Sequence, residues 1–147
     1  MKKKKYYLVG IAVILVILAG MFIFNNQDNN DYMKIETPYC DLYYPNQWED
    51  SVRININESD ICMVEFYAKI GDKPEVQMFN IVFGGQFSNP IGQLDVNNES
   101  IDVSIMTFDF IDSYDWSEEE KESYYAMQED VNCIISNLSK LKNYSEY

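Results

Sequence analysis

The chain has 147 residues, and its 24 Asp and Glu outnumber its 11 Lys and Arg, which gives a formal net charge of −13 at pH 7. Such an acidic surface repels nucleic acid and anionic lipid headgroups, which argues against nucleic-acid binding. Histidine is absent, which removes the commonest general base, the usual zinc ligand and every histidine-dependent triad. The three cysteines, Cys40, Cys62 and Cys133, are too few and too scattered for a disulfide scaffold or a zinc site.

The first feature along the chain is a cluster of lysines, Lys2–Lys5, followed by an uncharged run, Tyr6–Phe24. These 19 residues would span about 28 Å as a helix, close to the ~30 Å hydrocarbon core of a bilayer. Lysines favour the cytoplasmic side of a membrane, and tyrosines favour its interface. The sequence therefore predicts a cytoplasmic tail over residues 1–5, a single-pass transmembrane helix over residues 6–24, and a C-terminal domain outside the cell membrane.

Two other kinds of N-terminal segment fit this run less well. A signal peptide ends at a small-residue cleavage site, but here the apolar run continues to Phe24 beyond its only small pair, Ala19 and Gly20. Cleavage is nevertheless left open. A lipoprotein signal would need a cysteine where this chain has Met21.

The residues after Phe24 carry seven basic and 24 acidic side chains, a net charge of −17. This excess attracts cationic groups, although solubility alone also explains it. The polar segment Asn25–Asp31 predicts a short linker. Residues 32–147 are then enough for one extracytoplasmic domain with a hydrophobic core.

Alternation of apolar and polar residues predicts a series of strands within this domain. Apolar residues on both faces of Val76–Phe83 are typical of a central strand. The predicted strands are Lys34–Tyr44, with a bulge or an edge position at Pro38, Val52–Asn57, Ile61–Ile70, Val76–Phe83, Ile91–Val96 and Ile101–Phe110. Because short turns join them, we expect an antiparallel meander of five or six strands.

The period of the pattern changes after Ser117. Ser117 and Glu120 form a capping box, and the three glutamates that follow Ser117 favour a helix N-terminus. One apolar stripe then recurs at helical spacing, made of Tyr124, Met127, Val131, Ile134, Leu138 and Leu141. The sequence thus predicts one long amphipathic helix, Glu118–Leu141, packed on one face of the sheet. The expected fold class is α+β, with an N-terminal transmembrane helix.

The segment Leu42–Trp48 consists of a strand ending in Tyr-Pro, with a tryptophan three residues later. It resembles the opening of PsbP-like domains. That resemblance implies an antiparallel sheet flanked by helices, and an accessory or binding protein rather than an enzyme. It covers about ten residues and supports the fold class only; the chain shows one clear helix, where that family has more.

Aromatic residues gather around the first predicted strands. Tyr39, Tyr43 and Trp48 are candidates for contact with a partner, because exposed aromatic residues bind glycans, peptides and proteins. The alternative is that most of them complete the core, and the sequence favours neither interpretation.

Two of the cysteines are candidates for a disulfide bond. If Lys34–Tyr44 pairs with Ile61–Ile70, Cys40 lies opposite Cys62 on the inward face, at a distance that a disulfide can bridge. The intervening strand, Val52–Asn57, could instead separate them. The alternative is that all three cysteines are reduced thiols that act as small hydrophobic residues.

No catalytic, cofactor-binding or metal site is predicted. Asp109, Asp112 and Asp115 could bind Ca²⁺, but the glycine and the final glutamate of a calcium loop are missing, so a solvated loop is favoured. The sequence predicts a membrane-anchored binding or accessory domain without catalytic activity. Its expected partner is a membrane protein or an envelope component with cationic groups. The alternatives are a structural subunit of an envelope complex and, more distantly, a hydrolase that uses carboxylates.

Overall fold

The computed structural model describes residues 31–85, 89–109, 111 and 114–147. The chain divides into two compact units, Met1–Tyr32 and Met33–Tyr147, and the account below concerns the second. The predicted membrane span, Tyr6–Phe24, and all but the last residue of the predicted linker lie outside the described residues. The strands are β1 (Tyr32–Glu36), β2 (Asp41–Pro45), β3 (Val52–Glu58), β4 (Cys62–Ala68), β5 (Val76–Phe83), β6 (Pro90–Val96), β7 (Glu99–Thr107) and β8 (Tyr144–Glu146). The helices are the 3-10 helix η1 (Asn46–Trp48) and the α-helices α2 (Glu118–Glu129) and α3 (Val131–Leu138).

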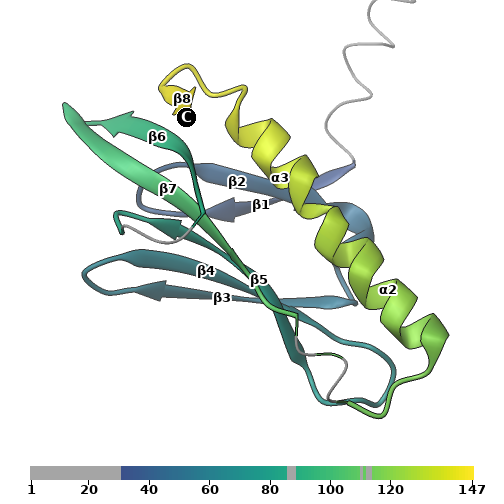
Figure 1. The fold of residues 1–147 in the computed structure, drawn as a ribbon. Helices are drawn as coiled ribbons and strands as arrows, with labels where there is room; N and C mark the ends of the chain where they lie inside the picture. Colours follow the sequence, from purple (N-terminus) through teal and green to yellow (C-terminus); the bar gives the residue numbers. More distant parts are fainter. Residues whose placement is uncertain (1–30, 86–88, 110, 112–113) are drawn as a thin grey trace, which may run out of the picture. The chain divides into compact units, whose positions relative to one another are not determined.

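Six strands form one antiparallel sheet in the order β3-β4-β5-β7-β6-β8 (Figure 1). β7 lies between β5 and β6, so the predicted meander is interrupted at this point. β6 and β7 form a tight hairpin in which Asn97 and Asn98 both have positive φ, 52° and 69°. Asparagine tolerates this conformation, which the preferred two-residue hairpin turn requires.

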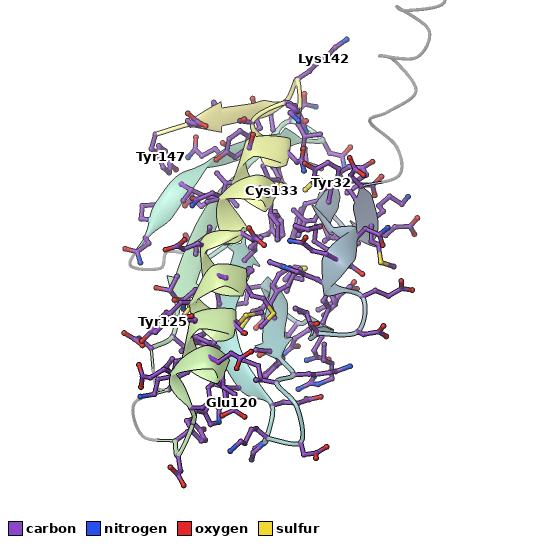
Figure 2. All side chains as sticks on the ribbon, turned by 90° about the vertical axis from the view of Figure 1, so that its right-hand side faces the viewer. Tyr32, Glu120, Tyr125, Cys133, Lys142 and Tyr147 are labelled. Atoms are coloured by element: carbon purple, nitrogen blue, oxygen red, sulfur yellow. The ribbon has the colours of Figure 1, made fainter. Side chains whose placement is uncertain are left out.

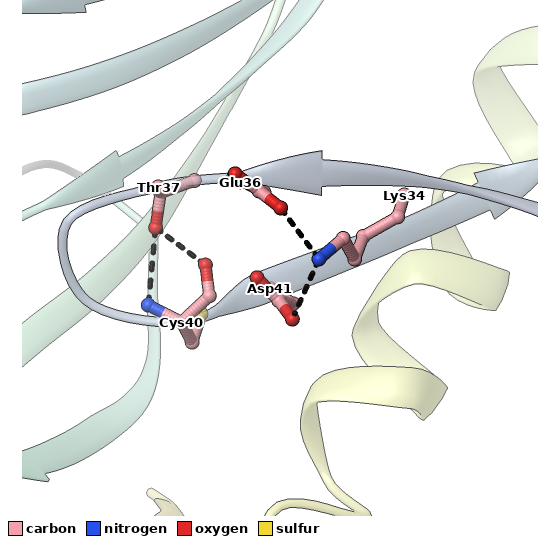
Figure 3. Close-up of polar contacts among 5 residues, drawn as sticks. All are labelled: Lys34, Glu36, Thr37, Cys40 and Asp41. Atoms are coloured by element: carbon pink, nitrogen blue, oxygen red, sulfur yellow. Dashed lines mark hydrogen bonds and ion pairs between the residues drawn. The ribbon is translucent and has the colours of Figure 1, made fainter.

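β1 and β2 form a separate two-stranded sheet. The Thr37 hydroxyl closes their turn, because it accepts a hydrogen bond from the Cys40 N–H at 3.1 Å and donates one to the Cys40 carbonyl at 2.6 Å (Figure 3). The Lys34 ammonium bridges the two strands by pairing with Glu36 at 2.7 Å and Asp41 at 3.4 Å. The prediction of one strand over Lys34–Tyr44 is therefore wrong, as is its pairing with Ile61–Ile70, since the chain reverses after Glu36.

The hydrophobic core lies on one face of the large sheet, beneath the helices and the β1–β2 hairpin. Phe66 on β4 and Phe79 on β5 are register partners, and their rings stack with centroids 4.5 Å apart. Trp48 packs against both rings, at 6.2 and 6.1 Å. A short helix after β2 thus joins the hairpin to the centre of the sheet.

α2 and α3 follow each other along the sheet, from Glu120 near one end to Cys133 and then Lys142 near the other (Figure 2). The predicted capping box is confirmed: the Ser117 hydroxyl accepts from the Glu120 N–H at 3.2 Å, and the Glu120 carboxylate accepts from the Ser117 N–H at 2.7 Å. The prediction of one helix over Glu118–Leu141 is wrong, because the chain leaves the helical pattern at Asp130 and α3 ends at Leu138.

The predicted fold class is therefore wrong. The described part of the chain is mostly β-sheet, with a six-stranded and a two-stranded sheet and a broken C-terminal helical segment. β8, which pairs with β6 at the sheet edge, was absent from the prediction because three residues are too few to show alternation. No helix among the described residues combines the length and the apolar character that crossing a membrane requires.

Candidate functional site

A cavity of about 400 Å³ opens beside the start of β3, where three parts of the chain meet. This volume is at the lower end of the ~300–1,000 Å³ typical of ligand pockets. η1 and the following turn contribute one wall, the turn after β4 contributes a second, and α2 with its C-cap residue Asp130 contributes a third. The lining residues are Gln47, Trp48, Ser51, Lys69, Ile70, Gly71, Ser123, Ala126, Met127 and Asp130.

Asp130 is held in place by residues from the opposite wall. Its Oδ2 accepts a hydrogen bond from Trp48 Nε1 at 3.3 Å and another from Gln47 Nε2 at 3.1 Å. The Trp48 indole is itself fixed, since it is only 1% exposed and packs against both Phe66 and Phe79. The carboxylate is thus positioned by two neutral donors, which leave its negative charge uncompensated.

Lys69, an exposed residue, is the basic residue of the cavity lining. Its backbone N–H donates to the Ser51 carbonyl at 2.8 Å, which fixes the start of its side chain at the cavity wall. Neither Lys69 nor Asp130 forms an ion pair within the part of the chain that the structure describes. The second carboxylate oxygen of Asp130, Oδ1, also receives no hydrogen bond there. The cavity therefore has one cation and one anion available for a ligand.

The remaining lining is apolar at its base and polar at its rim. Trp48 and Ile70 are buried and Met127 is half-buried, whereas Gln47 and Ser123 are exposed. A pocket with an apolar floor and a few fixed polar groups can hold a small ligand in one orientation. The chemistry of this pocket fits a ligand with both an ammonium and a carboxylate group, such as an amino acid or a short peptide.

The aromatic residues predicted to contact a partner do not form one surface. Tyr39 is half-buried against Phe83, with ring centroids 5.6 Å apart, whereas Trp48 packs on Phe79, four residues earlier on β5. Four residues of a strand correspond to about 13 Å. Tyr43 is 37% exposed on β2. A partner contact stays a prediction for these residues, and Trp48, which lines the cavity, is 1% exposed.

The structure contains Cys40 and Cys62 as free thiols, the first half-buried and the second buried. The pKa of the Cys40 thiol is raised to about 12, mainly by burial and to a smaller extent by Asp41 and Cys62, whereas the hydrogen bond with the Thr37 hydroxyl opposes this shift. Burial also raises the pKa of Cys62. Both thiols are therefore protonated at neutral pH, and in this form they are poor nucleophiles. Their disulfide stays a prediction.

The described residues contain no group of three or more cysteine, aspartate or glutamate side chains placed to hold a metal ion. Asp112, one of the three aspartates considered for Ca²⁺, lies outside the described residues. Asp109 accepts a hydrogen bond from the Tyr125 hydroxyl at 3.1 Å.

Sequence reasoning did not identify Lys69 or Asp130. Asp130 is one of 24 acidic residues, and its donors lie 82 and 83 positions away in the sequence. Only folding brings these groups together. The sequence offers one weak sign of this site: the acidic residue Asp130 directly precedes Val131, a member of the apolar stripe of the predicted helix.

Comparisons of the chain with protein-family models, with curated proteins and with solved structures found no match. The resemblance of Leu42–Trp48 to PsbP-like domains stays a prediction.

Proposed function

We propose that this protein is a binding or accessory domain without catalytic activity, held at the outer side of the cell membrane, and that the cavity at Lys69 and Asp130 is its ligand site. The observation that carries the proposal is the pair of opposite charges on one cavity, each without an ion-pair partner among the described residues. Lys69 is exposed and Asp130 is half-buried, so both charges are open to a ligand that enters the cavity.

The proposed ligand is a zwitterionic group on a peptide or on an envelope component. Its ammonium would bind Asp130 Oδ1 and its carboxylate would bind Lys69 Nζ. The acidic surface would favour approach of the cationic end. This ligand chemistry agrees with the partner expected from the sequence, a membrane protein or an envelope component with cationic groups.

The membrane location is proposed from the N-terminal sequence. Lys2–Lys5 and the uncharged run Tyr6–Phe24 favour an anchor, and the seven residues of Asn25–Asp31 would reach ~15 Å as a flexible coil. The ligand would then be at the membrane. Protease added to intact cells or protoplasts should remove residues 25–147. Full protection of these residues would contradict the proposed location.

Binding is tested with the full-length chain in detergent, titrated with zwitterionic dipeptides and with their N-acetylated and C-amidated forms. Acetylation removes the positive charge, and amidation removes the negative one. Each change should weaken binding about tenfold or more, because a hydrogen bond to a charged group contributes ~1.5–3 kcal/mol. Calorimetry or chemical-shift changes measure the affinities.

Two variants assign the charges. Asp130→Asn keeps an acceptor for Trp48 but removes the charge, so it should bind free and acetylated peptides equally. Lys69→Gln should lose the preference for the free carboxylate. Glu129→Gln, next to Asp130 in the sequence, and Lys142→Gln, an exposed lysine outside the cavity lining, are controls and should behave like the wild type. Equal affinity of the wild type for all peptide forms would contradict the proposal.

The absence of catalytic activity needs its own measurement. We expect no turnover of ester, peptide or glycoside substrates by the full-length chain. Turnover that one Asp or Glu substitution abolishes would contradict this expectation. A protein that co-purifies in stoichiometric amount with wild type and with Asp130→Asn would instead support the alternative of a structural subunit.

A further inference from the structure

The large sheet has two edges, and they differ in length and in protection. β8 at one edge has three residues. β3 at the other has seven, pairs with β4 without a register shift, and has no second strand beside it among the described residues (Figure 1). An unpaired strand of this length offers backbone groups to another chain.

The backbone groups on the free side of β3 can be assigned. Just before β3 the Lys69 N–H donates to the Ser51 carbonyl, and just after it the Ser59 N–H donates to the Ile61 carbonyl. Residues 51 and 59 therefore face β4, and the odd-numbered residues between them do the same, because an antiparallel ladder alternates. The N–H and C=O groups of Val52, Ile54, Ile56 and Glu58 point away from β4 to the free edge.

β3 lacks several of the features that block edge pairing, although it carries two charged residues, Arg53 and Glu58. Its sequence, VRININE, contains no proline and no lysine, and proteins use both of these, as well as bulges, to prevent edge contacts. Residues 55–58 are exposed, and Ile56 is 39% exposed. Burial of this isoleucine by a second strand would be favourable.

We propose that β3 pairs with β3 of a second copy of this chain, antiparallel and about a twofold axis at Asn55. Asn55 is the middle residue of the strand, so this register pairs all of it. Ile54 then lies opposite Ile56 of the second copy, with both residues in hydrogen-bonding positions, and Val52 lies opposite Glu58. The two sheets become continuous, and the interface is identical on both sides, as a twofold dimer requires.

Side-chain chemistry supports this register. Asn55 lies opposite Asn55 of the second copy, where two amides can bond to each other, and Arg53 lies opposite Asn57. No like charges are opposed. A register centred on Arg53 would place two guanidinium groups face to face, which is unfavourable. Arg53 is in addition held over the Tyr67 ring, 4.0 Å from its centroid, and paired with Glu75.

Cysteine cross-linking of the full-length chain in detergent tests the register. Asn55→Cys should form a disulfide-linked dimer under mild oxidation, because opposed residues that are not hydrogen-bonded approach closely enough. Asn57→Cys is the matched control on the same face. Its two copies would be offset by four residues, about 13 Å along the strands, so it should not cross-link, and nor should the wild type with its native cysteines.

A second variant tests the backbone bonds. Ile56→Pro removes an N–H that faces only the free edge, so the fold should survive. The dimer should no longer be detected by sedimentation, and Asn55→Cys combined with Ile56→Pro should no longer form the cross-link. Equal cross-linking at positions 55 and 57, no cross-link at position 55, or a dimer that persists with Ile56→Pro would each overturn the proposal. Cross-linking of Asn55→Cys only to a different protein would also overturn it and would indicate a foreign strand at this edge.

Discussion

α2 and α3 come from one continuous apolar stripe in the sequence, yet they are stabilised in different ways. α2, EEEKESYYAMQE, buries only Tyr124 and begins with a capping box. α3, VNCIISNL, is shorter and buries Val131, Ile134 and Leu138. Polar contacts therefore determine where α2 begins and how it docks, whereas burial of apolar side chains holds α3 on the sheet.

Asp130 separates the two helices and belongs to both. Its N–H bonds to the Ala126 carbonyl at the end of α2, and its carbonyl accepts from the Cys133 N–H in the first turn of α3. The same residue presents its carboxylate to the cavity. The position of the Asp130 carboxylate thus depends on both helices, on the polar contacts of α2 and on the apolar packing of α3.

The largest effect should come from the apolar anchor of α3. Leu138→Ala should cost about 2–5 kcal/mol, because Leu138 is 1% exposed and its removal leaves a cavity in the core. Urea unfolding of the full-length chain measures this. Glu122→Ala, on the exposed face of α2, is the control and should change stability little. A Leu138→Ala protein as stable as the wild type would show that α3 is not held by burial.

The cap of α2 should contribute less. Ser117→Ala removes the acceptor for the Glu120 N–H and should cost about 1 kcal/mol. Ser117→Asp keeps an acceptor at this position and should restore most of the stability. If alanine and aspartate are equivalent in urea unfolding, the capping box does not stabilise α2.

The Tyr124 hydroxyl docks α2 on the sheet. It donates to the Phe108 carbonyl at 2.7 Å and lies 3.2 Å from the Gln77 carbonyl. Tyr124→Phe should cost about 0.5–1.5 kcal/mol, the usual net value of one hydrogen bond. Gln128 also donates to the Phe108 carbonyl, at 2.8 Å, so that acceptor keeps a partner. Tyr125→Phe, which changes an exposed hydroxyl, should cost less.

A separate effect of Tyr124 should be visible only at alkaline pH. The pKa of Tyr124 is raised from 10.0 to about 12, mainly by burial and to a smaller extent by the nearby Asp109. Since the folded state disfavours the phenolate, the wild type should lose stability as the pH rises from 10 to about 12. Tyr124→Phe should remove this part of the pH dependence. Unfolding midpoints of the two proteins across this range make the comparison, and parallel profiles would contradict it.

Sequence patterns predicted the position of most strands and the start of α2, because these features depend on residues that are close together in the sequence. The strands β3 to β7 lie within three residues of their predicted bounds, since alternation reports a half-buried strand directly. The capping box was also predicted correctly, because its four residues are adjacent. The first predicted strand is wrong at Thr37–Cys40, where Pro38 predicts a bulge or an edge position but the Thr37 hydroxyl closes a reversal of the chain.

The amino-acid sequence by itself determined where apolar and polar residues alternate, where α2 begins, and that the domain is acidic and lacks histidine. Only the tertiary structure decided the position of β7 between β5 and β6, the break at Asp130 and the exposure of the β3 edge. It also decided which acidic and basic residues share a cavity, because Lys69, Trp48 and Asp130 meet across long stretches of chain. Local propensities act over a few residues, whereas these features depend on contacts between segments that only the packed core brings together.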